Sequence, residues 1–130
     1  MVYTLTREVR RDVAETVAMM REALAASGFG VLTEIDLQAT LKAKLDVDVP
    51  AQVILGACRP NLAHAAIVAE PSIAVFLPCN VVVRDAGGGR TIIEAMDPGF
   101  MIEVTGNPDL GAVGSDARLR IEAAMASLRD

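Results

Sequence analysis

Apolar and polar residues change their spacing along the chain, and each change marks a predicted element. Residues 2–8 alternate and are rich in β-forming side chains, which predicts a first strand. From residue 10 to residue 26 the apolar positions recur at helical spacing, so we predict an amphipathic helix that Gly28 ends in a left-handed turn. The inward stripe of this helix comprises Val13, Val17, Met20 and Leu24.

The middle of the chain predicts two strands and two short helices. Residues 30–37 return to a strand pattern, and Asp36 is placed to cap a short helix. The apolar residues of that helix recur every four positions, at Leu37, Leu41 and Leu45. Residues 51–58 form the next predicted strand, and residues 61–70 form another short helix that Pro71 stops.

The last third predicts a hairpin and a closing helix. Two β-rich segments, 73–85 and 90–97, are joined by "AGGG", whose glycines take positive φ freely. A loop around Pro98 follows, and then "NPDL" (107–110) supplies a cap and a first-turn proline. The closing helix carries its apolar face at Leu110, Val113, Ala117, Ile121, Ala124 and Leu128.

These elements predict one α+β domain over residues 1–130. Neighbouring strand patterns joined by short turns favour an antiparallel or mixed sheet over a purely parallel one. We expect a mostly antiparallel sheet with the two long helices packed on one face and the short helices inserted between strands.

Composition narrows the classes of partner. The 17 acidic and 12 basic residues give a net charge of −5, and the chain has no Trp, one Tyr and three Phe. Nucleic-acid binding normally needs a basic surface and stacking aromatics, so we expect no nucleic-acid partner. No apolar run is long enough to span a membrane, and the start lacks a signal-peptide pattern, which predicts a cytoplasmic protein. Because 52% of the residues are hydrophobic, we also expect a homodimer that buries some of them.

Several short motifs are typical of one known family. They are "LTEID" followed by "LKAKL", then "LGAC.P..AH.A...EP", "LPCNVVV", "AMDPGFM" and "GNPDL". Together they resemble the family catalogued as domain of unknown function 302, over nearly the whole chain. The resemblance implies an α+β fold similar to half of the TATA-binding protein, ordered β-α-β4-α, in small proteins that tend to form dimers. It implies no reaction, and the fold likeness does not imply DNA binding.

The candidate site contains both cysteines and the single histidine. Cys58, His64 and Cys79 all lie within the family motifs, at a strand end, in a short helix and in a later strand. Two thiolates and an imidazole would suit zinc or copper, with a fourth position open. A thiolate beside His64 would instead suit nucleophilic or redox chemistry. Free cysteines also pack well as small apolar side chains, and in the cytosol they stay reduced.

Three further residues and a capping aspartate are secondary candidates for ligand binding. Glu34 and Asp36 share a strand face, and Lys42 follows on the next helix, so a carboxylate and an ammonium could orient a ligand. The simpler interpretation is a capping Asp36 and a surface ion pair for Glu34. Asn80 follows Pro78 at a predicted bulge, and its amide could donate to a ligand or satisfy the backbone there.

The sequence therefore supports three hypotheses about function. The first is a small homodimeric domain that binds a small ligand or a metal, such as zinc or another transition metal, near Cys58, His64 and Cys79. The second is an enzyme with a cysteine thiolate nucleophile. The third is a structural dimerisation module in which the cysteines are buried.

Overall fold

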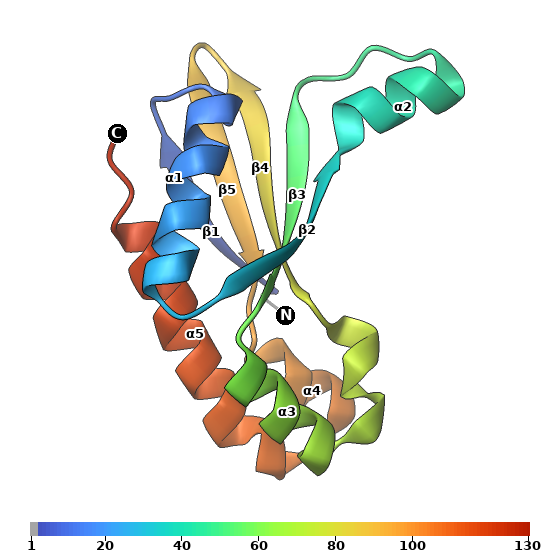
Figure 1. Ribbon diagram of the computed structural model, residues 1–130, viewed down its shortest axis with the longest axis vertical. Coiled ribbons are helices and arrows are strands. Elements are labelled where there is room, and N and C mark those ends of the chain that lie inside the picture. Colours follow the sequence, from blue (N-terminus) through green and yellow to red (C-terminus); the bar gives the residue numbers. More distant parts are fainter. Residues whose placement is uncertain (1–2) are drawn as a thin grey trace.

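A five-stranded antiparallel sheet forms the centre of the computed structural model, which describes residues 3–130 (Figure 1). The strands are β1 (Thr4–Val9), β2 (Gly30–Asp36), β3 (Gln52–Cys58), β4 (Cys79–Gly87) and β5 (Arg90–Met96). Their order across the sheet is β1-β5-β4-β3-β2, and every neighbouring pair is antiparallel. The predicted α+β class with an antiparallel sheet is confirmed.

Five α-helices and two 3₁₀ segments complete the fold within residues 3–130. The helices are α1 (Val13–Ala26), α2 (Leu37–Leu45), α3 (Pro60–Ala69), α4 (Phe100–Thr105) and α5 (Gly111–Ala126). The 3₁₀ segments are η1 (Pro71–Phe76) and η2 (Pro108–Leu110). None of these described helices combines the length and the apolar content that crossing a bilayer requires.

Helix ends follow the capping residues in the sequence. Asp12 caps α1, because its carboxylate accepts the backbone N–H of Glu15 at 2.8 Å. The chain leaves α1 through Gly28, whose φ of +87° is the left-handed geometry predicted for it. Asp36 caps α2 in the same way and accepts the N–H of Ala39 at 2.9 Å, as predicted. Local sequence therefore determines where these two helices begin.

The larger apolar core joins one face of the sheet to α1 and α5. Alternate residues of the inner strands point into it, and the two helices contribute their apolar stripes. Fully buried members include Leu24 from α1, Leu55, Val81 and Ile93 from the sheet, and Ile121 from α5. Each such side chain contributes about 1.5–3 kcal/mol relative to an exposed one.

A second, smaller core lies beyond one end of the sheet. Its buried members are Ala66 from α3, Ile73 from η1, Met101 from α4 and Leu110 from η2. Helix α5 is long enough to pack against both cores, and it contacts α1 as well as α3 and α4 (Figure 1). The smaller core therefore forms a helical end to the molecule, whereas α2 buries none of its residues.

Two predicted segments differ from the structure. Residues 73–78, predicted as the start of a long strand, are mostly the 3₁₀ segment η1, and the strand begins at Cys79. Pro71 begins this segment and Ile73 is buried in the smaller core, so packing overrides the β-forming composition. Pro78 consequently precedes β4 and does not interrupt it, which corrects the predicted strand bulge. The predicted loop around Pro98 contains α4.

Candidate functional site

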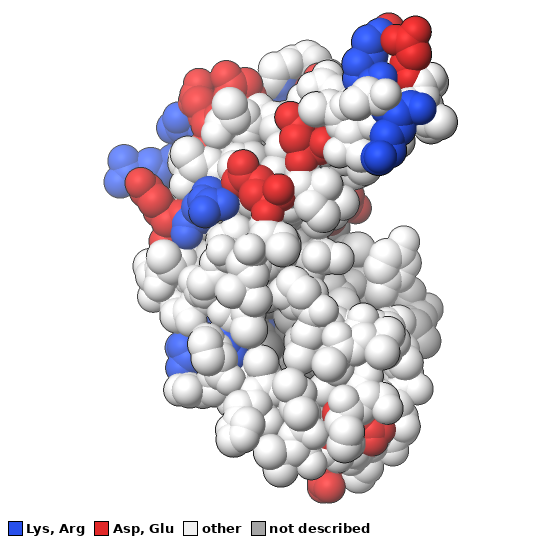
Figure 2. Space-filling view, turned by 45° about the vertical axis from the view of Figure 1, so that its right-hand side comes forward, with Lys and Arg blue, Asp and Glu red and all other residues white. Residues whose placement is uncertain are grey.

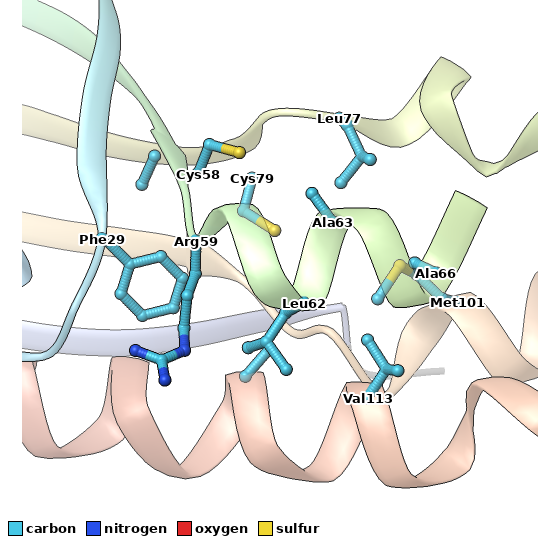
Figure 3. Close-up of a pocket in the computed structure, with 12 residues that line it drawn as sticks. Phe29, Cys58, Arg59, Leu62, Ala63, Ala66, Leu77, Cys79, Met101 and Val113 are labelled. Atoms are coloured by element: carbon cyan, nitrogen blue, oxygen red, sulfur yellow. The ribbon is translucent and has the colours of Figure 1, made fainter. Parts of the chain in front are cut away.

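A cleft lies where the sheet end, α3 and α5 meet, between the two apolar cores (Figure 3). About 340 Å³ of space lies between its lining atoms, much of it open to solvent, and the part that the centre of a water-sized sphere can enter is only about 20 Å³. Most of its lining is aliphatic or aromatic. The lining residues that matter most for chemistry and shape are Phe29, Cys58, Arg59, Leu62, Cys79 and Met101.

Both cysteines line this cleft. Cys58 is the last residue of β3 and is half-buried, whereas Cys79 is the first residue of β4 and is 7% exposed. Antiparallel pairing of β3 with β4 places Cys79 opposite Ala57, next to Cys58 in the chain. Burial, with a smaller contribution from the charge of the nearby Cys58, raises the pKa of Cys79 to about 11. Cys79 is therefore a neutral thiol at neutral pH.

His64 does not join the two cysteines. It lies on the exposed side of α3 and does not line the cleft. Ala66, two residues further on, is the buried residue of this helix, and two residues correspond to about 200° of helical rotation. Because the Ala66 side of α3 faces the core, His64 on the opposite side faces solvent. No group of three or more His, Cys, Asp or Glu residues within 3–130 is arranged to hold a metal ion, so the expected zinc or copper set is not assembled.

Asn80 is separated from the cleft by strand alternation. Cys79 and Val81 are buried, whereas Asn80 between them is exposed. Asn80 pairs with Gly56 and lies near Tyr3 and Met96, beside a shallow hollow distinct from the cleft. The amide predicted to serve the cysteine site therefore belongs to the opposite face of the sheet.

Glu34 and Lys42 form surface ion pairs away from the cleft. Glu34 accepts from Arg21 at 2.8 Å. Lys42 lies 2.9 Å from Asp46 and 3.2 Å from Asp48, and hydrogen bonds to these two carboxylates raise the pKa of Lys42. All these side chains are well exposed, so the simpler interpretation of Glu34 and Asp36 as a surface pair and a helix cap is the one observed.

Arg59 is the residue of the cleft that sequence reasoning did not select. It is the one charged side chain among the lining residues, and it immediately precedes Pro60, the first residue of α3. Its Nε is buried and has no hydrogen-bond partner among the residues that the structure describes. Its guanidinium packs against the backbone of Gly28, where an added Cβ would overlap Nη1. In Figure 3 the side chain extends from the end of β3 toward α5, beside Phe29.

The comparisons with known proteins identify the family. The model described as "Domain of unknown function DUF302" matches residues 5–128. This chain belongs to that family. The resemblance inferred from the motifs is confirmed, and among curated proteins nothing matches.

A solved DUF302 structure has the same fold. It is described as the crystal structure of an uncharacterized conserved protein DUF302 from Bacillus stearothermophilus. The two chains superpose with a TM-score of 0.89 at 28% sequence identity, over 97% of this chain and 98% of the other. Neither description names a ligand or a reaction.

A buried carboxylate in the DUF302 domain supports the fold beside the cleft. Asp97 follows β5 and is 6% exposed. Its carboxylate accepts the N–H of Gly99 at 2.9 Å and lies 3.2 Å from Nη1 of Arg118. Its backbone carbonyl accepts the N–H of Phe100 at the start of α4. Asp97 is thus fully engaged in positioning α4, which contributes Met101 to the cleft.

Proposed function

We propose that this DUF302 domain binds a small, largely apolar ligand in the cleft lined by Cys58 and Cys79. The observation that carries the proposal is the convergence of both cysteines on one apolar hollow between two cores. Binding clefts are typically concave, mostly apolar and provided with a few polar groups that orient the ligand. The lining residues Leu62 and Met101 supply the apolar surface, and the thiols and Arg59 supply the polar groups.

The protonation state of Cys79 favours ligand binding over catalysis by this thiol. A nucleophilic cysteine needs a lowered pKa, whereas burial raises the pKa of Cys79 to about 11. His64 faces solvent and does not stand beside either sulfur as a base. A zinc or copper site would need further ligands from outside the described residues. We therefore favour a ligand held by contact over a thiolate enzyme or a metal centre.

A cleft-filling variant tests this proposal. Ala63 lines the cleft from α3, whereas Ala65 is exposed on the same helix, so Ala63→Phe and Ala65→Phe form a matched pair. Hexan-1-ol is a suitable neutral probe, and the rate at which iodoacetamide alkylates Cys58 reports on occupancy. We expect hexan-1-ol to slow alkylation of Cys58 in the wild type and in Ala65→Phe, but not in Ala63→Phe. Equal alkylation rates with and without hexan-1-ol in the wild type would contradict the proposal.

We also propose that the domain forms a homodimer through its helical end. Four large apolar side chains of α3, η1 and α4 are exposed there: Ile67, Val68, Val75 and Val104. Val68 and Val75 are 72% and 82% exposed. Figure 2 shows that most charged side chains gather over the upper part of the molecule, whereas the lower, helical end has few of them and those at its tip are acidic. The exposed apolar side chains of this end are therefore the contact that a second copy can bury.

Light scattering during size-exclusion chromatography tests the dimer. We expect the wild type to have twice the mass of one chain, and Val68→Glu to have the mass of one chain. Leu119→Glu is the control, because Leu119 is 66% exposed on α5 outside this surface. A monomeric wild type would contradict the proposal, and so would a dimer that Val68→Glu leaves intact.

Three other expectations remain predictions. The likeness to half of the TATA-binding protein is one, and it concerns shape alone. The second is the lack of a nucleic-acid partner, because the net charge of −5 argues against binding a polyanion. The expected cytoplasmic location agrees with the two unpaired cysteines, since free thiols persist in a reducing compartment.

A further inference from the structure

The two cysteines of the cleft are neighbours across adjacent strands. Ala57 of β3 and Cys79 of β4 lie directly opposite each other in the antiparallel register, and Cys58 follows Ala57 in the chain. An offset of one residue places two Cα atoms about 6 Å apart, because paired strands lie about 4.8 Å apart and each residue advances about 3.3 Å. Disulfides join residues whose Cα atoms are about 4.4–6.8 Å apart. The register of the sheet therefore holds Cys58 and Cys79 within disulfide range.

Both thiols lie on the cleft side of the sheet end. Along a regular strand pair, residues offset by one would face opposite sides of the sheet. However, β3 ends at Cys58 and β4 begins at Cys79, so neither strand continues past these residues, and both side chains line the cleft. In Figure 3 both side chains extend from the strand ends toward α3. The charge of Cys58 also contributes to the raised pKa of Cys79, so the two sulfurs lie within electrostatic range of each other.

Prolines end the sheet pairing next to the two cysteines. Pro78 directly precedes Cys79, and Arg59 alone separates Cys58 from Pro60. Proline has no backbone N–H, so the hydrogen-bonded ladder between β3 and β4 stops at the pair of Ala57 with Cys79. Rotation of the two cysteine side chains, and of the chain at Pro78, therefore leaves the pairing of β3 with β4 in place.

Their different exposure gives the two thiols different roles. Cys58 is half-buried and reachable by a small oxidant from solvent, whereas Cys79 is 7% exposed. Redox-sensing cysteines are typically solvent-accessible thiols with a second, resolving cysteine beside them. Disulfides that form in a reducing compartment are usually transient and redox-sensing. Cys58 fits the first position, and Cys79 fits the second.

We propose that Cys58 and Cys79 are a redox-responsive pair that hydrogen peroxide converts to a reversible intramolecular disulfide. First, the Cys58 thiolate attacks peroxide and breaks its O–O bond, which leaves a sulfenic acid on Cys58 and releases one water that carries the thiol proton. Second, Cys79 loses its proton, attacks the sulfenic sulfur and displaces hydroxide, which leaves as a second water. The two thiols give up two electrons, and peroxide takes them. A dithiol reductant reverses the change, and the bond encloses residues 58–79, which contain α3 and η1.

Mass spectrometry of the peroxide-treated wild type tests the pair directly. We expect the intact chain to lose the mass of two hydrogen atoms, and neither cysteine to react with iodoacetamide once the chain is unfolded in urea. Dithiothreitol should restore both reactive thiols. The circular dichroism spectrum of the folded protein should be retained in the oxidised form, because the bond joins residues that the sheet already holds close together.

Two variants test the roles of the thiols. In Cys79→Ala the sulfenic acid on Cys58 has no resolving thiol, so we expect dimedone to label Cys58. In Cys58→Ala we expect Cys79 to oxidise at least about tenfold more slowly than Cys58 does in Cys79→Ala, because burial keeps Cys79 protonated.

A relocated thiol is the matched control. Asn80 is exposed on the opposite face of the sheet and pairs with Gly56, two residues before Cys58. The Cα atoms of residues 58 and 80 are therefore about 8 Å apart, beyond the reach of a disulfide. In the double variant Cys79→Ala/Asn80→Cys we expect no disulfide, and dimedone should label Cys58.

Three results would contradict the proposal. They are disulfides that link two chains, a wild type in which Cys58 is oxidised to sulfinic acid while Cys79 stays alkylatable, and a disulfide that forms only with loss of the fold. The wild-type experiment decides the matter even if a variant does not fold. It involves no ligand, so its failure leaves the proposed binding function standing, and failure of hexan-1-ol to protect Cys58 leaves the redox pair standing.

Discussion

Alkylation of Cys79 offers a quantitative test of how the cleft is built. The perturbation is pH, applied to a Cys58→Ala variant in which Cys79 is the one remaining thiol. Desolvation is the larger cause of the raised pKa of Cys79, and the charge of Cys58 is the smaller one. Removing Cys58 therefore lowers the pKa of Cys79 somewhat but leaves it above the ordinary value of 9.0.

The magnitude follows from the thiolate fraction. At pH 8, a thiol with a pKa of about 11 is about 0.1% ionised, whereas a thiol with a pKa of 9.0 is about 9% ionised. The thiolate is the species that reacts, so ionisation alone slows alkylation of Cys79 about a hundredfold in the wild type. The limited exposure of Cys79 slows it further at every pH. The informative quantity is therefore the pH at which the rate reaches half its maximum.

The same shift makes stability fall at alkaline pH. A thiol whose folded pKa is raised stabilises the fold fully below the unfolded pKa, and this contribution is lost as pH rises toward the folded value. Between pH 8 and pH 10, Cys79 accounts for a loss of about 1 kcal/mol in the free energy of unfolding. Urea denaturation of the wild type should show this loss, and Cys79→Ala should lack it.

The assay is iodoacetamide labelling followed by mass spectrometry, from pH 7 to pH 11. In folded Cys58→Ala we expect the midpoint of the rate profile to lie clearly above 9, and in the urea-unfolded chain to return to about the ordinary value of 9.0. A folded midpoint at or below the unfolded one would contradict the burial of this thiol. It would show that Cys79 is hydrated or activated, and the thiolate-enzyme hypothesis would then be favoured over ligand binding.

Two predictions concern Gly56 and Asp97, which support the structure around the cleft. In Gly56→Ala the new Cβ would overlap Thr33 Oγ1 and lie 2.8 Å from Pro78 Cγ, so we expect a loss of about 1–3 kcal/mol in urea denaturation. Thr33→Ala in the same chain should restore part of it, and an unchanged midpoint for Gly56→Ala would contradict this packing. Asp97→Ala removes a buried acceptor and should cost about 1–3 kcal/mol, whereas Arg118→Ala should cost less than about 1 kcal/mol because Arg118 is half-exposed. Equal losses for these two variants would show that the ion pair, and not the backbone contact, is what matters.

Much of the fold was predictable because its determinants are local. The stripe of α1, the capping Asp36 and the glycine turn between β4 and β5 all act through neighbours in the sequence. The predictions are wrong where packing against residues distant in the sequence determines the secondary structure. Residues 73–76 have strand composition but are held by the smaller core. Helix α4 has six residues between Gly99 and Gly106, too few to show a helical period.

The candidate site was predictable in part for the same reason. Cys58 and Cys79 could be grouped because both lie in the family motifs, Cys58 at the end of one predicted strand and Cys79 within the next predicted β segment, 73–85. The position of His64 depended on the rotation of α3 about its axis, which the contact of Ala66 with the smaller core determines. Arg59 could not be selected from the sequence, because an arginine before a helix is usually solvated. Its buried Nε follows from the approach of Gly28 and the cleft walls.

A crystal structure of the wild-type protein grown with hexan-1-ol would show whether the cleft holds an apolar ligand. We predict one hexan-1-ol in the cleft, with its chain between Leu62 and Met101, beside both cysteines. A cleft without hexan-1-ol at saturating concentration, or hexan-1-ol bound elsewhere on the protein, would contradict this prediction.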